Sequence, residues 1–187
     1  GGPQENVRTC SSASKPMNLN DLHRVHCLGV GGVGVSAVAK LLQRRGITVS
    51  GSDLQSSIFT TDLAAAGVQI FSEEKTTNVT EDIQLVVYSD ACPPTHPERQ
   101  AAVEKNIPTK NFSEVLGWLM AESENGVAVA GTNGKSTTTA LLGVILAAAK
   151  KDPTVVVGSR VPEFSGNVRL GKGEYFVSEA DDYRDHF

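Results

Sequence analysis

Six consecutive residues in the second half of the chain, Gly131-Thr-Asn-Gly-Lys-Ser136, have the types and order needed to hold a phosphate group. They follow a strand-like apolar stretch (127–130) and precede a helix-like run (140–149). Glycines between a strand and a helix let backbone N–H groups turn towards an anion, and the helix N-terminus adds its dipole. Lys135 would reach the β- and γ-phosphates of a nucleotide, and the Ser136 hydroxyl would bind Mg²⁺.

The spacing of this loop is tighter than the usual phosphate-loop pattern. That pattern has its first glycine five residues before the Gly-Lys pair, where this chain has Val129, and Gly131 follows two residues later. An ordinary glycine turn with an exposed lysine is the alternative. The position of Gly-Lys-Ser at a junction of strand and helix favours the phosphate loop.

A second glycine motif lies near the N-terminus. Gly29, Gly31 and Gly34 follow an apolar strand-like stretch (25–28) and satisfy G-x-G-x-x-G. The helix-like pattern after them stops at Gly46, a second strand follows, and Asp53 lies 19 residues beyond Gly34. Dinucleotide-binding units keep their ribose-binding acid at about this distance. The motif predicts a nucleotide diphosphate at a helix N-terminus and leaves open which nucleotide it is.

Acidic side chains gather after an apolar strand near the end of the chain. Glu179, Asp181 and Asp182 follow the strand-like stretch 174–177. A phosphate loop leaves Mg²⁺ in need of a second protein oxygen, which such a strand end commonly supplies. The alternative is a solvated acidic turn, and the upstream loop favours the metal site.

The chain between these motifs alternates predicted strands and helices, which indicates the α/β class. Asn111, with Glu114 three residues on, predicts a capping box for the helix that runs to Met120. We expect a Rossmann-like, mostly parallel sheet with helices on both faces, followed by an incomplete P-loop α/β ATPase domain. The predicted boundaries are a disordered tail (1–16), the Rossmann-like domain (17–121), a linker (122–126) and the beginning of the ATP-binding domain (127–187).

Composition narrows the function classes. The 187 residues are 40% hydrophobic and 20% charged, as in ordinary globular proteins, and the net charge of −4 does not favour nucleic-acid binding. No apolar run approaches the ~20 residues needed to cross a bilayer, so we expect no membrane partner. Cys10, Cys27 and Cys92 lack metal-ligand spacing, which favours a reduced, cytoplasmic chain with Cys27 and Cys92 in the core.

Three motifs together resemble the Mur ligases of peptidoglycan synthesis. Gly29–Ser36 with Ser50-Gly-Ser-Asp53 resembles the nucleotide-sugar domain of the branch that adds L-alanine. Residues 130–139 resemble the ATP loop of the whole family, and Glu179-Ala-Asp-Asp-Tyr183 resembles an acidic segment of the alanine-adding branch. Order and spacing agree from about Leu22 to the last residue.

The resemblance implies an ATP-dependent ligase that joins L-alanine to the lactyl carboxylate of UDP-N-acetylmuramate through an acyl phosphate. Lys135 would be catalytic, stabilising the transferring phosphoryl group, and Ser136 and Glu179 would bind Mg²⁺. The ATP phosphates would be bound by Gly131, Thr132, Asn133, Gly134, Lys135, Ser136 and Thr137. The UDP-sugar would be bound by Gly29, Gly31, Gly32, Val33, Gly34, Ser36 and, at its nucleoside end, Asp53.

The chain departs from the alanine-adding branch at three positions. Asn133 replaces the usual His, Ser136 the usual Thr and Asp182 the usual Glu, so the loop is closer to the branches that add later amino acids. These departures leave the amino-acid substrate open, and the sequence does not give the oligomeric state. Members of the family also have a complete central domain and a third domain, so we expect that this chain alone does not complete the reaction.

Two other functions are weighed against the ligase. An NAD(P)-dependent oxidoreductase would account for Gly29 to Asp53 but would leave the phosphate loop unexplained. A non-catalytic nucleotide-binding module would suit the short second domain, but Lys135, Ser136 and Glu179 argue against loss of function. Binding of UDP-N-acetylmuramate, NADH or neither would distinguish the three.

Overall fold

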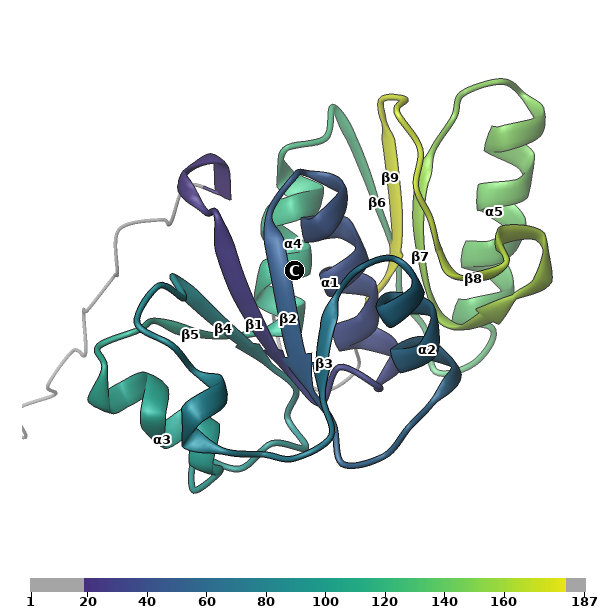
Figure 1. The fold of residues 1–187 in the computed structure, drawn as a ribbon. Coiled ribbons are helices and arrows are strands. Elements are labelled where there is room, and N and C mark those ends of the chain that lie inside the picture. The colour runs from purple at the N-terminus through teal and green to yellow at the C-terminus, as the bar shows by residue number, and fades with distance from the viewer. Residues whose placement is uncertain (1–18, 181–187) are drawn as a thin grey trace, which may run out of the picture.

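The first half of the chain forms a parallel sheet whose strands are the apolar runs of the sequence. The computed structural model describes residues 19–180 (Figure 1). All neighbouring strands in this sheet are parallel, in the order β3-β2-β1-β4-β5. The strands are β1 (Arg24–Leu28), β2 (Thr48–Ser52), β3 (Gln69–Phe71), β4 (Leu85–Tyr88) and β5 (Thr109–Asn111). The predicted Rossmann-like class is confirmed.

Side-chain caps fix where three helices of this half begin, and a proline helps in one of them. The elements are η1 (Leu19–Asp21), α1 (Val33–Arg44), α2 (Ile58–Ala65), η2 (Thr76–Asn78), α3 (Pro97–Glu104) and α4 (Phe112–Ala121). The predicted capping box of α4 is confirmed, because Asn111 Oδ1 accepts from the Ser113 N–H and the Glu114 carboxylate accepts from the Asn111 N–H. Pro97 occupies the first turn of α3, where a missing N–H costs no hydrogen bond.

The second half forms a smaller sheet in the order β6-β9-β7-β8, in which only β7 and β8 are antiparallel. Its elements are β6 (Asn125–Val129), α5 (Lys135–Ala148), β7 (Thr154–Val161), η3 (Pro162–Phe164), β8 (Gly166–Arg169) and β9 (Tyr175–Glu179). The sequence predicted a strand ended by Gly158, whereas β7 continues past that glycine through a register shift between Val156 and Val161. Strand β8 was not predicted.

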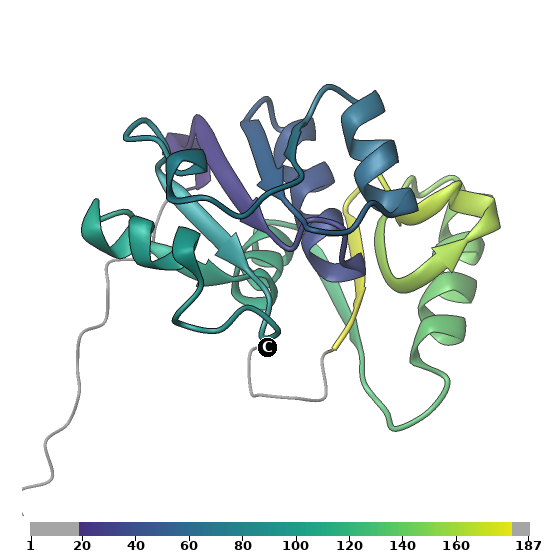
Figure 2. The same cartoon turned by 60° about the horizontal axis from the view of Figure 1, so that its bottom comes forward.

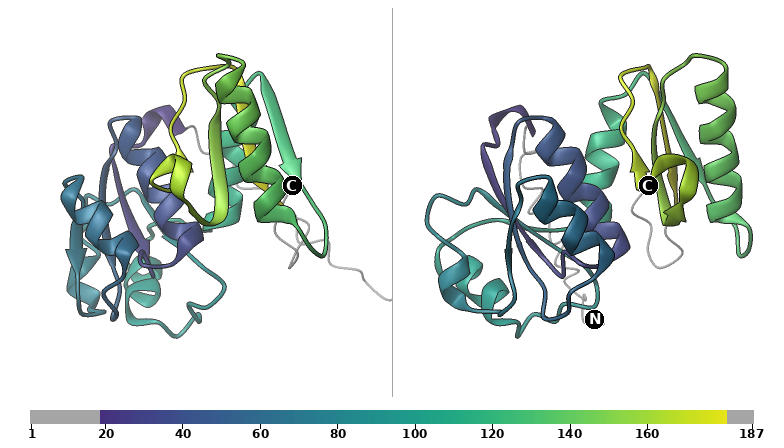
Figure 3. Two further views of the ribbon diagram at one scale, coloured as in Figure 1. Left: turned by 90° about the vertical axis from the view of Figure 1, so that its right-hand side faces the viewer. Right: turned by 45° about the vertical axis from the view of Figure 1, so that its right-hand side comes forward.

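The two sheets share one helical layer. Figure 3 shows α1 and α4 between the sheets, with α5 on the outer face of the second sheet. One buried cluster joins residues of α1 and α4 to Val156, Val168 and Phe176 of the second sheet, whereas Val155 and Val177 pack towards α5 in a separate cluster. The predicted linker 122–126 lies between two sheets that share one buried cluster, and β6 begins within it at Asn125.

The structure describes some of the residues on which the predictions about cysteines, membrane spans and the N-terminal tail depend. Cys27 and Cys92 are buried and unpaired, as predicted, and burial raises the pKa of the Cys27 thiol to about 12. Within residues 19–180 no helix has the length and apolar character to cross a membrane. The predicted tail 1–16, Cys10, Asp181 and Asp182 lie outside the described residues.

A buried polar network supports the strand ends from the α3 side of the first sheet. The Glu98 carboxylate of α3 is fully buried, and it accepts hydrogen bonds from the Ser52 hydroxyl and, at 2.6 Å, from Asn78 Nδ2. Its Oε2 lies 3.6 Å from Nε2 of the buried His26, whose Nδ1 is 2.8 Å from the Ser50 hydroxyl. Ser52 ends β2 directly before Asp53, so this network supports the base of the glycine motif.

Replacing Glu98 with Gln tests this network. Burial opposes ionisation of Glu98, but the nearby His26 ring and the hydrogen bonds from Ser52 and Asn78 outweigh it and lower the pKa below its ordinary value of 4.5. The carboxylate thus stabilises the fold above that value, and this contribution is lost as the pH falls through the lowered pKa. We expect Glu98→Gln to lower the free energy of unfolding by about 1–3 kcal/mol at pH 7. The Gln side chain has only one acceptor oxygen, so its NH₂ group would face a buried donor, Ser52 or Asn78.

Urea unfolding between pH 7 and pH 3 measures both effects. The difference between wild type and Glu98→Gln should shrink towards the acid end, because the wild-type carboxylate is then protonated. Glu104→Gln, an exposed position on the same helix, is the control. A Glu98→Gln difference that is absent at pH 7, or independent of pH, would contradict this role.

Candidate functional site

The glycine motif forms a tight turn at the carboxyl end of β1. The N–H groups of Gly29 and Val30 donate to the Ser52 carbonyl at 2.9 and 3.1 Å, and Gly32 N–H donates to the Gly29 carbonyl at 3.0 Å. Helix α1 then begins at Val33, with Gly32 as its N-cap and without a side-chain cap. The first-turn N–H groups of a helix form a natural site for an anion.

Asp53 lies against this turn, on the side of β2. Its Oδ2 accepts from the Gly31 N–H at 2.8 Å, and its Oδ1 accepts from the Gln55 N–H at 2.9 Å. The Ser57 hydroxyl donates to the Gly31 carbonyl at 3.1 Å. A Cβ at Gly31 would lie 2.7 Å from Asp53 Oδ2, so glycine is required for this contact. The structure thus brings Asp53 to the glycine motif, as its spacing suggested.

The phosphate-loop candidate has the backbone conformation of an exposed glycine turn. Gly131 and Gly134 have φ of 147° and 77°, values that L-residues rarely adopt. Residues 131–134 are exposed, and α5 begins directly after them at Lys135. Lys135 Nζ donates to the Gly131 carbonyl at 2.6 Å, so the side chain folds back over the loop. Ser136 and Thr137 follow in the first turn of α5.

Glu179 lies at the same sheet edge because β9 is the parallel neighbour of β6. Val129, the last residue of β6, pairs with Glu179, and its carbonyl accepts from the Ala180 N–H at 2.9 Å. Glu179 Oε1 accepts from the Gly158 N–H at 2.6 Å. A Cβ at Gly158 would lie 2.8 Å from Glu179 Oε2, so Gly158 leaves room for the carboxylate.

One pocket of about 190 Å³ connects the two motifs. Val33 and Gly34 contribute from the first turn of α1, and Lys135 and Glu179 contribute from the second sheet. Figures 1 and 2 show that β1 and β6 run in the same direction, so the loops that follow them lie on the same side of the molecule. The remaining wall comes from Phe112, Ser113, Leu116, Val156, Val157, Gly158, Ser178 and Ala180.

A second hollow lies on the other flank of the glycine motif. Its volume is about 260 Å³, and Gly29, Ser89 and Cys92 are among the residues that line it. His96 Nε2 and Glu74 Oε2, 3.0 Å apart, close one wall. The hollow lies where the strand order reverses between β1 and β4, the usual ligand position in open parallel sheets.

Not every predicted residue faces these spaces. The Ser36 side chain is fully buried, and its hydroxyl donates to the Val33 carbonyl at 2.9 Å. Sequence reasoning also missed Gly158, which was interpreted as a strand end. A glycine inside a run of valines is typical of a bulge or of a close approach by another group, and that signal could have identified it.

Glu179 and Ser136 carry the kind of oxygen that a hard cation binds. Mg²⁺ takes one or two protein oxygens and completes its shell with phosphate oxygens and water. Glu179 offers a carboxylate at the pocket, and Ser136 offers a hydroxyl in the first turn of α5. Among residues 19–180 no group of three or more His, Cys, Asp or Glu side chains forms a metal site by itself.

Comparison with known proteins places this geometry in a family. Residues 24–124 match the model of the Mur ligase family, catalytic domain. UDP-N-acetylmuramate–L-alanine ligase from Lachnospira eligens is 42% identical over 171 residues, which are 91% of this chain and 37% of that protein. The enzyme of the same name from Agathobacter rectalis is 41% identical over 174 residues, 93% of this chain and 37% of that protein.

A solved structure agrees with these relatives. The crystal structure of UDP-N-acetylmuramate–alanine ligase from Thermotoga maritima matches with a TM-score of 0.77 and 31% identity, over 83% of this chain and 37% of that chain. The present chain thus spans little more than a third of the relatives that it matches. By the family model and by these relatives, the chain belongs to the Mur ligase family.

Proposed function

We propose that this chain is the part of a UDP-N-acetylmuramate–L-alanine ligase that binds the UDP-sugar and the phosphates of ATP. One observation carries the proposal: Gly34 of the glycine motif, Lys135 of the phosphate loop and Glu179 line the same pocket. A ligase that activates a carboxylate with ATP must bring the carboxylate substrate and ATP together. A pocket between two anion-binding loops would let the two ligands meet. The names of the relatives support the choice of substrates.

The proposed reaction has two steps. The lactyl carboxylate of UDP-N-acetylmuramate attacks the γ-phosphorus of ATP, which gives an acyl phosphate and ADP. The amino group of L-alanine then attacks the acyl carbon, phosphate leaves, and an amide remains. Phosphoryl transfer depends mainly on positioning and on neutralising charge, so the Lys135 ammonium and the backbone N–H groups of the loop suit the first step.

We assign the ATP phosphates to the loop between β6 and α5. The backbone of this loop would bind the phosphates, and the Lys135 ammonium would leave the Gly131 carbonyl to stabilise the transferring group. Ser136 and Glu179 would hold Mg²⁺, which would neutralise phosphate charge when bound. The phosphate-binding residues of this proposal are Gly131, Thr132, Asn133, Gly134, Lys135, Ser136 and Thr137.

We assign the UDP-sugar to the glycine motif. A diphosphate there would take N–H groups of Gly31 and its neighbours, and would therefore compete with the Asp53 carboxylate that now accepts from Gly31. Asp53 would turn to the nucleoside, and the sugar would extend past Val33 and Gly34 into the shared pocket. Gly29, Gly32 and Ser36 complete the proposed set, with Ser36 acting from within the first turn of α1.

The L-alanine site is not assigned to any described residue. We place the protein in the cytoplasm, because the reaction needs ATP and because Cys27 and Cys92 are unpaired thiols. An NAD(P)-dependent oxidoreductase would use the glycine motif but would leave Lys135, Glu179 and their common pocket without a role.

A ligand-binding panel tests the proposal. Calorimetry and thermal unfolding of this chain with UDP-N-acetylmuramate, and separately with NADH, should show binding of the UDP-sugar alone. A ligand that binds only the folded state at ~100 times its dissociation constant stabilises it by ~2.7 kcal/mol. Stabilisation by NADH without a response to UDP-N-acetylmuramate would favour the oxidoreductase, and a response to neither would favour a non-catalytic module.

Replacing Gly158 with Ala tests the metal site. The added methyl would contact Glu179 Oε2, so the carboxylate must move, and we expect affinity for Mg-AMPPNP to fall about tenfold or more, as for other groups that orient a metal ligand. Affinity for UDP-N-acetylmuramate should change little. Calorimetry with and without Mg²⁺ separates metal-dependent binding from the rest.

Gly166→Ala is the matched control, because its Cβ would meet only Lys40 Nζ, at 3.5 Å, which is ordinary contact. An equal loss in both glycine variants, or a loss at Gly158 that persists without Mg²⁺, would contradict the assignment of Glu179 as a metal ligand.

A further inference from the structure

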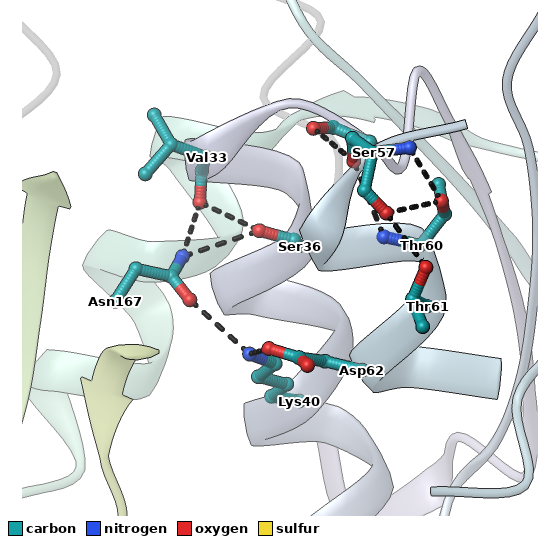
Figure 4. A network of polar contacts seen from close by, with 9 residues as sticks. Val33, Ser36, Lys40, Ser57, Thr60, Thr61, Asp62 and Asn167 are labelled. Atoms are coloured by element: carbon teal, nitrogen blue, oxygen red, sulfur yellow. Dashed lines mark hydrogen bonds and ion pairs between the residues drawn. The ribbon is translucent and has the colours of Figure 1, made fainter. Parts of the chain in front are cut away.

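One asparagine of the second sheet is buried against the helix that carries the glycine motif. Asn167 lies on β8 and is fully buried. Its Nδ2 donates to the Val33 carbonyl at 2.7 Å and to the Ser36 hydroxyl oxygen at 3.2 Å, and its Oδ1 accepts from Lys40 Nζ at 3.3 Å (Figure 4). All three partners belong to α1.

The partners fix which way the amide points. A lysine ammonium can only donate, and a backbone carbonyl can only accept. Oδ1 must therefore face Lys40, and the NH₂ group must face Val33. The Ser36 hydroxyl fits the same arrangement, since it donates to the Val33 carbonyl while it accepts from Asn167. Every polar atom of the Asn167 side chain thus has a partner on α1.

Lys40 ties the same contact to the next helix. Its Nζ lies 3.6 Å from Asp62 Oδ2 on α2 and 5.8 Å from the centre of the Phe59 ring. The N-cap of α2 is Ser57, whose hydroxyl donates to the Gly31 carbonyl. Figure 4 shows contacts that run from Asn167 through Lys40 to Asp62, and a separate group of contacts around Ser57. The glycine motif is therefore held from two directions, by Ser57 on one side and by Asn167 on the other.

The contact lies beside the pocket. Val33, whose carbonyl accepts from Asn167, and Gly34 line the pocket together with Lys135 and Glu179 of the second sheet. A shift of the first turn of α1 relative to β8 would therefore change the separation of the two anion-binding loops. Asn167 opposes such a shift, because its side chain donates hydrogen bonds from the second sheet to two residues of this turn, Val33 and Ser36.

We propose that Asn167 is a positioning residue that holds the first turn of α1 against β8 and thereby couples ligand binding at the glycine motif to ligand binding at the phosphate loop. This inference rests on the proposed function for the identity of the two ligands. Because coupling of binding is reciprocal, Mg-AMPPNP should raise the affinity for UDP-N-acetylmuramate by the same factor by which the UDP-sugar raises the affinity for Mg-AMPPNP.

Asn167→Asp removes the donor and keeps the shape. The carboxylate can still accept from Lys40, but it has no hydrogen to offer the Val33 carbonyl. We expect calorimetry of the wild-type chain to show positive coupling, of about 5-fold or more, and the variant to show a factor near 1. Arg44→Ala is the matched control, because Arg44 donates to the Leu170 carbonyl from the far end of the same helix and should leave the coupling factor intact.

A ligand-free measurement separates this inference from the proposed function. Hydrogen exchange at the amides of residues 34–37 should become faster in Asn167→Asp than in Arg44→Ala. If the wild type binds no UDP-N-acetylmuramate, the proposed function fails, and this exchange alone decides the positioning role. Coupling that is absent in the wild type, or equal in Asn167→Asp and wild type, overturns the inference, as does unchanged exchange.

A second variant covers the case in which Asn167→Asp does not fold. Lys40→Met removes the ammonium group that donates to Asn167 Oδ1. The two donor contacts of Asn167 with Val33 and Ser36 stay in place. We expect a coupling factor between that of wild type and 1. A role in stability alone would instead lower the unfolding temperature and leave the coupling factor unchanged.

Discussion

The burial of one helical layer between two sheets is the constraint on which the rest of the structure depends. Strands of the second sheet present apolar side chains to both faces, with Val155 and Val177 towards α5 and Val156 and Phe176 towards the shared layer. A strand with two apolar faces cannot leave either in water without losing about 25 cal/mol for each Å² exposed. The second sheet must therefore pack on α1 and α4 as well as on α5.

This packing decides where the two anion-binding loops lie. Helix α1 begins at the glycine motif, so the layer that joins the sheets also places that motif beside the second sheet. Strands β1 and β6 run in the same direction (Figure 3), which brings the loops after them to the same side of the molecule. Phe112 packs directly against the backbone of Gly34, since a Cβ on Gly34 would lie only 2.4 Å from the Phe112 ring. Close packing of glycine against phenylalanine thus shapes the pocket wall.

Short-range patterns predicted most of the fold and both loops. The two glycine motifs, the strands that precede them and the capping box at Asn111 depend on neighbouring residues, and all lie where the sequence placed them. The β7 strand was cut short because Gly158 was taken as a terminator, although a glycine can also make room for Glu179. Strand β8 was missed because its polar and glycine residues give no strand pattern by themselves.

Contacts between distant residues could not be predicted from the chain alone. Asn167 and Ser36 are 131 residues apart, and nothing local indicates that a polar residue of β8 would be buried against α1. The contact between Asp53 and the Gly31 N–H joins residues 22 positions apart, and the expected place of Asp53 at the nucleoside stays a prediction. The acidic residues Asp181 and Asp182 lie outside the described residues, so their expected place near the metal site stays a prediction.

The central claim is that the UDP-sugar and the nucleotide phosphates meet in one pocket. Paramagnetic broadening tests it directly, with Mn²⁺-AMPPNP at the phosphate loop and UDP-N-acetylmuramate observed by proton NMR. Broadening falls steeply with distance, so the account predicts that the lactyl methyl protons broaden more than the uracil protons. Equal broadening at both ends, or stronger broadening of uracil while both ligands are bound, would contradict the shared pocket.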